Sequence, residues 1–140
     1  MVRISDLTLI KELMKNSRIP YTELAEMFGV SEAAIRKRIR RLKEKGVIRK
    51  YTLDVDVRKL GFEIRALIGV DTLPEYFLSV VDMLKQREEV VSLYTCSGDH
   101  MILLETWARN SDELISFVKF LESISGVTRV CPAILLEKIK

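Results

Sequence analysis

Residues 21–50 read YTELAEMFGVSEAAIRKRIRRLKEKGVIRK, and this stretch predicts two short helices joined by a sharp turn. The apolar side chains of the first helix fall on one face, as the helical repeat requires: Leu24, Ala25 and Phe28. Gly29 then ends this helix, because glycine adopts a left-handed conformation at little cost. Ser31 is placed to cap the second helix by accepting a hydrogen bond from a free backbone N–H.

The second helix, expected at residues 32–45, is apolar on one side and basic on the other. Spacing at i, i+4 and i+7 predicts a buried stripe of Ile35, Ile39 and Leu42. Lys37 and Arg40 are among the side chains predicted to point away from it. Gly46 follows as a C-cap candidate. A helix anchored by its apolar side and basic on its outer side suits the major groove of DNA.

Charge is concentrated in the same stretch. Residues 36–50 hold nine Lys or Arg against one acid, Glu44, a net charge of +8. The whole chain holds 23 basic and 20 acidic residues, a net charge of +3, so all other residues sum to −5. Such a patch is the expected footprint of phosphate contacts, although a solvated basic face on an ordinary helix pair is the alternative. Because turn, cap and charge agree, double-stranded DNA is the expected partner.

Composition narrows the class of protein. The chain has 140 residues, of which 48% are hydrophobic, enough for a proper core. Its longest run without a charged residue, Val90 to Gly98, is far shorter than the ~18 residues of a membrane span. No basic-then-apolar leader opens the chain, so a cytoplasmic location and no membrane partner are expected. Abundant charge and only three Asn or Gln residues hint at a heat-adapted source.

Three parts are expected along the chain: a helix-turn-helix head domain, residues 1–50; an extended linker, residues 51–62; and a body domain, residues 63–140. The head is expected to gain a first helix that ends near Lys15 and buries Leu7, Ile10, Leu13 and Met14. Alternating apolar residues predict an extended segment over 47–57. Through Phe62, Lys and Arg number 15 against 8 acids, whereas beyond it they number 8 against 12. This change of sign suggests a boundary between units with different tasks.

The body is predicted to run strand, helix, strand, strand, helix, strand. The expected ranges are 63–71, 74–87, 90–97, 101–108, 111–125 and 127–139. Ser111 is expected to cap the second of these helices. The order is that of the ferredoxin-like βαββαβ fold, so the fold class is α+β.

Both faces of the predicted strands are apolar, but two helices can cover only one face of the sheet. An uncovered apolar face would be costly in water, and a second copy of the same sheet is the simplest cover, which predicts a homodimer. In the usual strand order of such sheets, Cys96 and Cys131 lie at opposite edges, too far apart to bridge within one chain. Their spacing suggests neither a disulfide framework nor a metal motif, so no metal or other cofactor is expected.

Taken together, the chain resembles the Lrp/AsnC (feast/famine) family of transcriptional regulators over nearly its whole length. The matching segments are RIPYTELAEMFGVSEAAIRKRIRRLKEKGVIRKYT at 18–52, LGF at 60–62, SGDHMILLE at 97–105 and GVTRVCPAILLEKIK at 126–140. The resemblance implies a winged helix-turn-helix head and a ferredoxin-like body. In that family the body binds effectors, frequently free amino acids, and dimerises through its sheet, often assembling further into tetramers or octamers.

The resemblance also assigns candidate site residues by position. It makes residues of the helix-turn-helix motif the DNA contacts: Tyr21, Thr22, Ser31, Glu32, Ala33, Arg36, Lys37, Arg38, Arg40 and Arg41. It makes the turn of the body hairpin part of an effector site at the interface between bodies, with the last strand, from another subunit, contributing further contacts: Ser97, Gly98, Asp99, His100, Met101, Thr128, Val130 and Pro132.

This sequence departs from the family at that turn. The family's turn usually reads G-x-x-D, and the aspartate falls at Met101 here. A carboxylate could pair with an effector's ammonium group, whereas a thioether cannot, so Asp99 is a candidate substitute. Plainer interpretations compete: Gly98 and Asp99 suit an ordinary hairpin turn, and the lone histidine, His100, is more simply structural. If one strand included both Asp99 and His100, they would point to opposite faces.

Two further function classes compete with a regulator. The architecture also resembles siroheme-type decarboxylases, whose chemistry would need convergent polar groups in the body. One histidine offers little for that, so the protein is expected not to be an enzyme. The other alternative is a DNA-architectural protein without an effector.

Overall fold

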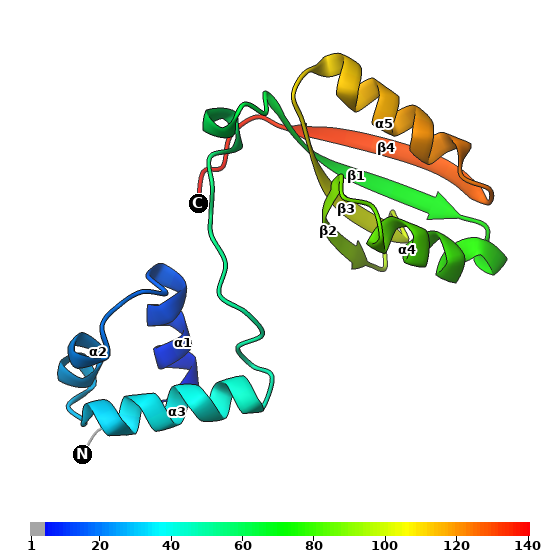
Figure 1. Cartoon of the computed structure of the whole chain (residues 1–140). Coiled ribbons are helices and arrows are strands. Elements are labelled where there is room, and N and C mark those ends of the chain that lie inside the picture. Colours follow the sequence, from blue (N-terminus) through cyan, green and yellow to red (C-terminus); the bar gives the residue numbers. More distant parts are fainter. Residues whose placement is uncertain (1–4) are drawn as a thin grey trace. The chain divides into compact units, whose positions relative to one another are not determined.

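The computed structural model describes residues 5–140 and divides the chain into two compact units, one ending at Asp54 and the other beginning at Val55 (Figure 1). The first unit holds three helices, α1 (Asp6–Lys15), α2 (Tyr21–Phe28) and α3 (Glu32–Glu44). They enclose a core of aliphatic side chains: Leu9, Leu13, Ile19, Leu24, Ala25, Ile35, Ile39 and Leu42.

The turn between α2 and α3 confirms the prediction. Gly29 is left-handed, with φ of 63°, and its backbone N–H bonds back to the end of α2. The Ser31 hydroxyl accepts a hydrogen bond from the Ala34 N–H at 3.1 Å and so caps α3. Gly46 also has positive φ just past the end of α3.

The buried face of α1 differs from the prediction. Leu9 is fully buried and was not predicted, whereas Leu7 and Met14 are 63% and 80% exposed. Leu9 and Leu13, spaced i, i+4, form the stripe that packs on the other two helices, with Ile10 half-buried beside them. Leu7 lies roughly 200° around the helix from Leu9, so both cannot face the core.

The predicted extended segment forms no strand, since residues 47–56 contain no helix or strand. An isolated extended segment has no neighbour with which to form a ladder of hydrogen bonds. Within the predicted linker, a 3₁₀ helix, η1 (Val57–Leu60), begins where the Asp56 side chain accepts from the Arg58 N–H. Val57 is buried, so the ordered second unit begins before the predicted boundary at residue 63.

The second unit has the predicted order of elements. It comprises β1 (Ile64–Thr72), a 3₁₀ turn η2 (Pro74–Tyr76), α4 (Phe77–Lys85), β2 (Val90–Thr95), β3 (Ile102–Ala108), α5 (Ser111–Ser123) and β4 (Val127–Leu135). The strands form one antiparallel sheet in the order β2-β3-β1-β4. Cys131 lies on the edge strand β4, and Cys96 follows the opposite edge strand β2. Both are free thiols, as predicted.

Element boundaries differ in three places. Asn110, and not Ser111, caps α5, because its side-chain oxygen accepts from the Glu113 N–H at 2.9 Å. The helix predicted from Pro74 begins as a 3₁₀ turn. The last strand ends at Leu135 instead of Ile139, since β1, its only neighbour, pairs with it no further.

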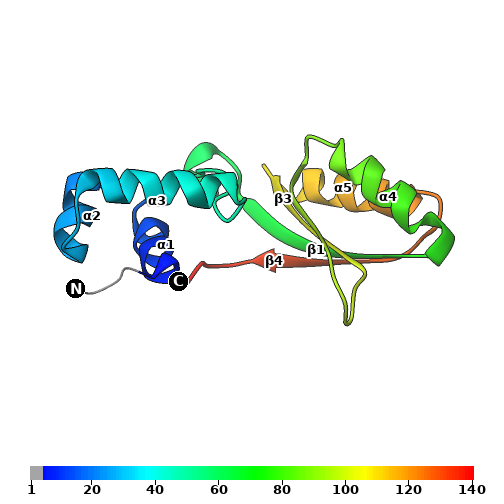
Figure 2. The same ribbon diagram turned by 90° about the horizontal axis from the view of Figure 1, so that it is seen from below.

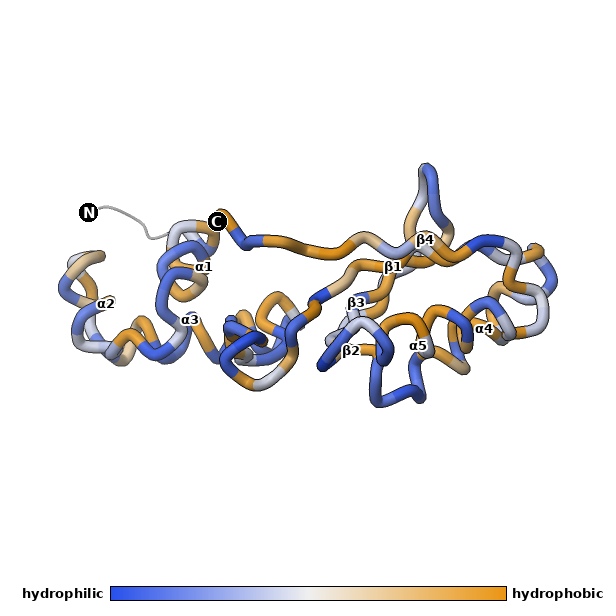
Figure 3. The backbone as a smooth tube through the Cα atoms, turned by 90° about the horizontal axis from the view of Figure 1, so that it is seen from above, coloured by the Kyte–Doolittle hydropathy of each residue, from blue (hydrophilic) through white to orange (hydrophobic). Residues whose placement is uncertain are grey.

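Helices α4 and α5 lie on one face of the sheet (Figure 2). Alternate residues of the two central strands, including Ala66, Ile68 and Leu104, are fully buried beneath them. No element of the described unit covers the opposite face, called here the open face. Most of β1 and much of β4 consist of hydrophobic residues, which are orange in Figure 3. None of the helices within residues 5–140 has the length and apolarity needed to cross a bilayer.

Candidate nucleic-acid interface and loop site

Helix α3 presents the candidate DNA-binding surface. Ile35, Ile39 and Leu42 are at most 2% exposed, which fixes the rotation of the helix on its unit. Eight of the ten predicted DNA contacts are consequently exposed: Thr22, Ser31, Glu32, Ala33, Arg36, Lys37, Arg40 and Arg41. Exposed guanidinium and ammonium groups beside a free helix start are the groups that contact phosphates and base edges.

Tyr21 and Arg38 are half-buried. The Arg36 guanidinium lies 5.6 Å from the centre of the Tyr21 ring, a cation–π contact that links the start of α2 to α3.

Arg38 is directed toward α1. Its Nη1 donates to Asp6 Oδ1 at 2.8 Å, and Arg41 Nη2 reaches the same oxygen at 3.5 Å. The hydrogen bond from Arg38 lowers the pKa of Asp6 and outweighs the opposing effect of burial, with further help from the positive charges of Arg38, Arg41 and Lys45. Arg38 therefore stabilises the packing of α1 on α3 as well as adding charge.

The loop at residues 96–101 joins β2 to β3 and holds the predicted effector residues Ser97, Gly98, Asp99, His100 and Met101. The Cys96 N–H donates to the Met101 carbonyl at 3.0 Å and closes the loop. His100 lies in this loop and not in the strand. The prediction that Asp99 and His100 point to opposite faces therefore does not apply, and His100 Nε2 lies 3.4 Å from Asp99 Oδ2.

Asp71, near the end of β1, anchors the loop. Its Oδ1 accepts from the Met101 N–H at 2.9 Å, and its Oδ2 accepts from Arg129 Nε at 2.7 Å and lies 3.0 Å from His100 Nδ1. Burial would raise the pKa of Asp71, but hydrogen bonds from Arg129, Met101 and His100 outweigh it and hold the pKa at about 2. The bond to Asp71 in turn raises the pKa of Arg129.

Sequence reasoning missed Asp71 and Arg129. They are direct partners in the register of β1 with β4, so opposite charges on adjacent strands were the available signal. Thr128, Val130 and Pro132 alternate with Arg129 along β4, and Val130 packs on the core beneath the helices. Within one chain, then, the structure brings Arg129 to the loop and leaves Val130 and Pro132 on the other face, whereas Thr128 lies at a break in the pairing of β4 with β1.

Gly69 allows the His100 ring to lie on the sheet. A Cβ built at Gly69 would clash with the ring atoms Cγ and Cδ2 of His100. The histidine therefore packs directly on the backbone of β1, on the open face.

A second polar cluster lies farther along the open face. Glu105 accepts from Arg65 Nη2 at 3.0 Å and from Trp107 Nε1 at 2.7 Å. Trp107 is thus partly buried on the open face, with the centre of the Phe62 ring 5.7 Å from the centre of its own ring. The strand registers place apolar side chains between the two polar clusters: Leu67, Leu103, Cys131 and Ala133.

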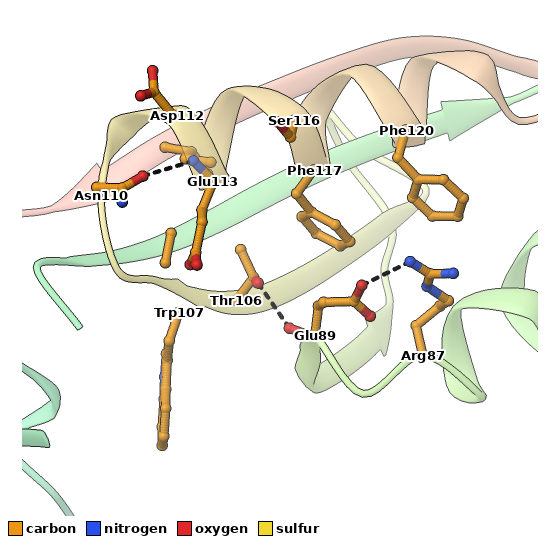
Figure 4. A pocket seen from close by; sticks show the side chains of 12 residues that line it. Arg87, Glu89, Thr106, Trp107, Asn110, Asp112, Glu113, Ser116, Phe117 and Phe120 are labelled. Carbon is orange, nitrogen blue, oxygen red and sulfur yellow. Dashed lines mark hydrogen bonds and ion pairs between the residues drawn. The ribbon is translucent and has the colours of Figure 1, made fainter. Parts of the chain in front are cut away.

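A groove on the helical face runs between α5 and the start of β2 (Figure 4). Some of its polar groups are paired within the chain: Arg87 donates to Glu89 at 2.7 Å, and its guanidinium lies 4.2 Å from the centre of the Phe120 ring, while Arg87 Nε is buried without a hydrogen-bond partner among the described residues. Glu113 accepts from the Arg109 N–H at the start of α5. Phe117 contributes to the core. Among residues 5–140, no group of three or more His, Cys, Asp or Glu could hold a metal ion.

Comparisons with known proteins agree on both units. A winged helix-turn-helix DNA-binding model matches residues 3–49, and an Lrp/AsnC ligand binding domain model matches residues 65–140. The chain is 44% identical over 141 residues to the HTH-type transcriptional regulator LrpA of Pyrococcus horikoshii, covering all of both chains. It is 33% identical to LrpA1 of Halobacterium salinarum, covering 94% of each. The solved structure of Escherichia coli AsnC matches with a TM-score of 0.82 and 26% identity, covering 99% of this chain and 96% of that one.

Proposed function

Because the chain belongs to the Lrp/AsnC family of transcriptional regulators, we propose that α3 enters the major groove of an operator while the body binds a small effector and pairs with a second copy. The chain is a DNA-binding regulator with a helix-turn-helix domain and a ligand-binding domain. Three points are our proposals: which residues contact DNA, which effector the body binds, and how the chains assemble.

One observation carries the DNA-reading proposal. The outer side of α3 exposes Arg36, Lys37 and Arg40, while three buried aliphatic side chains fix the other side. Phosphate contacts from this basic surface would supply most of the affinity, and Lys37, Arg40 and the helix start would discriminate bases. We place Tyr21 and Thr22 at the edge of the same surface, as phosphate contacts, and Ser31, Glu32 and Ala33 at the helix start that faces the bases.

We assign the effector site to the loop at residues 96–101, with an amino acid as the expected ligand. Asp99 is the carboxylate of this loop, and its side chain is 82% exposed. It can therefore meet an ammonium group where the family's usual aspartate is replaced by Met101. Thr128, Val130 and Pro132 of a second subunit remain candidates to complete the site.

The proposed assembly is a dimer through the open face, with tetramers or octamers built from it. Leu67, Leu103 and Ala133 lie on that face without a cover within the described unit. A second copy removes this apolar surface from water.

The effector proposal is tested by thermal shift of the full chain with each of the twenty amino acids. We expect a selective rise in melting temperature with one or a few of them, because a ligand bound only to the folded state stabilises it. If none of the twenty amino acids raised the melting temperature, an effector-free DNA-architectural protein would be favoured. A visible tetrapyrrole spectrum in the purified protein would instead favour the decarboxylase alternative.

A further inference from the structure

We propose that Asp71 and Arg129, which both lie outside the loop at residues 96–101, are positioning residues that hold this loop and direct the Asp99 carboxylate. The inference rests on the proposed function, in which Asp99 meets the ammonium group of an effector. Asp71, His100 and Arg129 are together called the loop latch.

Asp71 is the centre of the latch. One of its carboxylate oxygens accepts from the Met101 N–H at 2.9 Å, and the other accepts from Arg129 Nε at 2.7 Å and lies 3.0 Å from His100 Nδ1. Its side chain is only 15% exposed, so an unpaired carboxylate there would be unfavourable. These partners use both carboxylate oxygens of Asp71. Asp71 therefore holds the loop and does not bind a ligand.

Arg129 links the latch to Asp99. Its Nη2 donates to the Asp99 carbonyl at 2.6 Å and lies 3.3 Å from Asp99 Oδ1 and from His100 Nδ1. The backbone of Asp99 is thus restrained while its carboxylate faces solvent. A charged group held in place before binding loses less conformational freedom when a ligand arrives, so the latch should raise the affinity of the loop.

A substitution at Gly69 disturbs the latch without replacing any of its three residues. Its φ is not positive, so alanine meets no backbone strain there. The obstacle to a Cβ at Gly69 is the side-chain ring of His100. Gly69→Ala therefore displaces the ring without changing any charge.

The first experiment measures hydrogen–deuterium exchange of the full chain without ligand. In Asp71→Asn and Arg129→Gln we expect exchange at residues 97–101 to accelerate about tenfold or more, because hydrogen bonds to a charged group are lost. Exchange in the centres of β1 and β3 should not change. Asp82→Asn, at an exposed position on α4, is the matched control and should behave as the wild type. Unchanged loop exchange in Asp71→Asn would overturn the proposal.

The second experiment is a double-mutant cycle of Gly69→Ala with His100→Ala, and it does not depend on the folding of the Asp71 variant. We expect Gly69→Ala to accelerate loop exchange when the ring is present and to have no effect once His100→Ala has removed it. An equal effect of Gly69→Ala in both backgrounds would contradict the latch.

The third experiment separates this inference from the proposed function. With the amino acid that stabilises the wild type, we expect Asp71→Asn to raise the half-saturating concentration about tenfold and Asp82→Asn to leave it unchanged. If the wild type responds and Asp71→Asn responds at the same concentration, the positioning role is wrong. A further outcome is that the wild type shows no rise in melting temperature with any of the twenty amino acids while Asp71→Asn still accelerates loop exchange. In that case the proposed effector function is wrong, and the role of Asp71 in holding the loop is supported.

Discussion

Arg38 and Arg40 lie two positions apart on α3 but have different surroundings. Arg38 donates to Asp6 on α1, whereas Arg40 is exposed on the outer side of the helix. A guanidinium with free donors can make two parallel hydrogen bonds to a guanine edge. Of the two, Arg40 is therefore the better placed to read sequence.

We expect Arg40→Ala to weaken binding to the operator by ~1–3 kcal/mol, because a bidentate guanine contact is lost. Fluorescence anisotropy with operator and random duplexes measures it. Lys11→Ala removes one positive charge from the exposed side of α1 and is the matched control. An equal loss on random DNA would show that Arg40 contacts only phosphate.

The lowered pKa of Asp71 has a consequence for stability at low pH. Its pKa falls from 3.8 to about 2 in the folded protein, so its ion pair stabilises the fold fully above about pH 4. That stabilisation, at most about 2.5 kcal/mol from the size of the shift, is lost as the pH falls through about 2.

We therefore expect the free energy of unfolding of wild type and Asp71→Asn to differ above pH 4 and to converge toward pH 2. Urea unfolding followed by the fluorescence of Trp107, the only tryptophan, reports on the second unit. A difference that stays constant over this range would mean that the Asp71 charge does not stabilise the fold.

Helix α1 shows how narrow a buried helical stripe can be. Leu9→Ala should destabilise the first unit by ~2–5 kcal/mol, because Leu9 is fully buried among α1, α2 and α3. Leu7→Ala and Met14→Ala, on the exposed side, should each stay within about 0.5 kcal/mol of the wild type. Urea unfolding followed by far-ultraviolet circular dichroism compares the three, and a similar loss in all of them would contradict the observed face of α1.

Local pattern was sufficient to predict α3 and the order of the body elements from the sequence. The stripe of Ile35, Ile39 and Leu42, the Ser31 cap and the Gly29 turn all depend on residues a few positions apart. For α1 the pattern was ambiguous, since aliphatic side chains surround the helix and only its neighbours select the buried ones.

The loop latch depends instead on contacts between residues distant in sequence. His100 and Arg129 lie 29 and 58 positions from Asp71 and meet it through the register of three strands. Periodicity does not determine register, so the candidate loop could be predicted from sequence while the residues that hold it could not.

At the scale of the whole molecule, we propose that the open face pairs two copies of the chain. Leu103 of β3 lies on that face, directly opposite Gly69 of β1. No element of the described unit covers its side chain. We expect the wild type to sediment as a dimer or larger species at micromolar concentration and Leu103→Lys to shift it toward the monomer, because a buried unpaired charge is unfavourable. Leu78→Lys, at a 74% exposed position on α4, is the control and should assemble normally. A monomeric wild type would exclude the proposed pairing.

Two copies of α3, held by paired bodies, should enter successive major grooves of one operator. Methylation protection of guanine N7 on the DNA upstream of the protein's own gene, in dilute salt, measures this arrangement. We expect two clusters of protected guanines whose centres lie about 10–10.5 base pairs, or a multiple of that, apart. Protection of a single cluster, or no protection at micromolar protein, would show that two paired heads do not bind one operator.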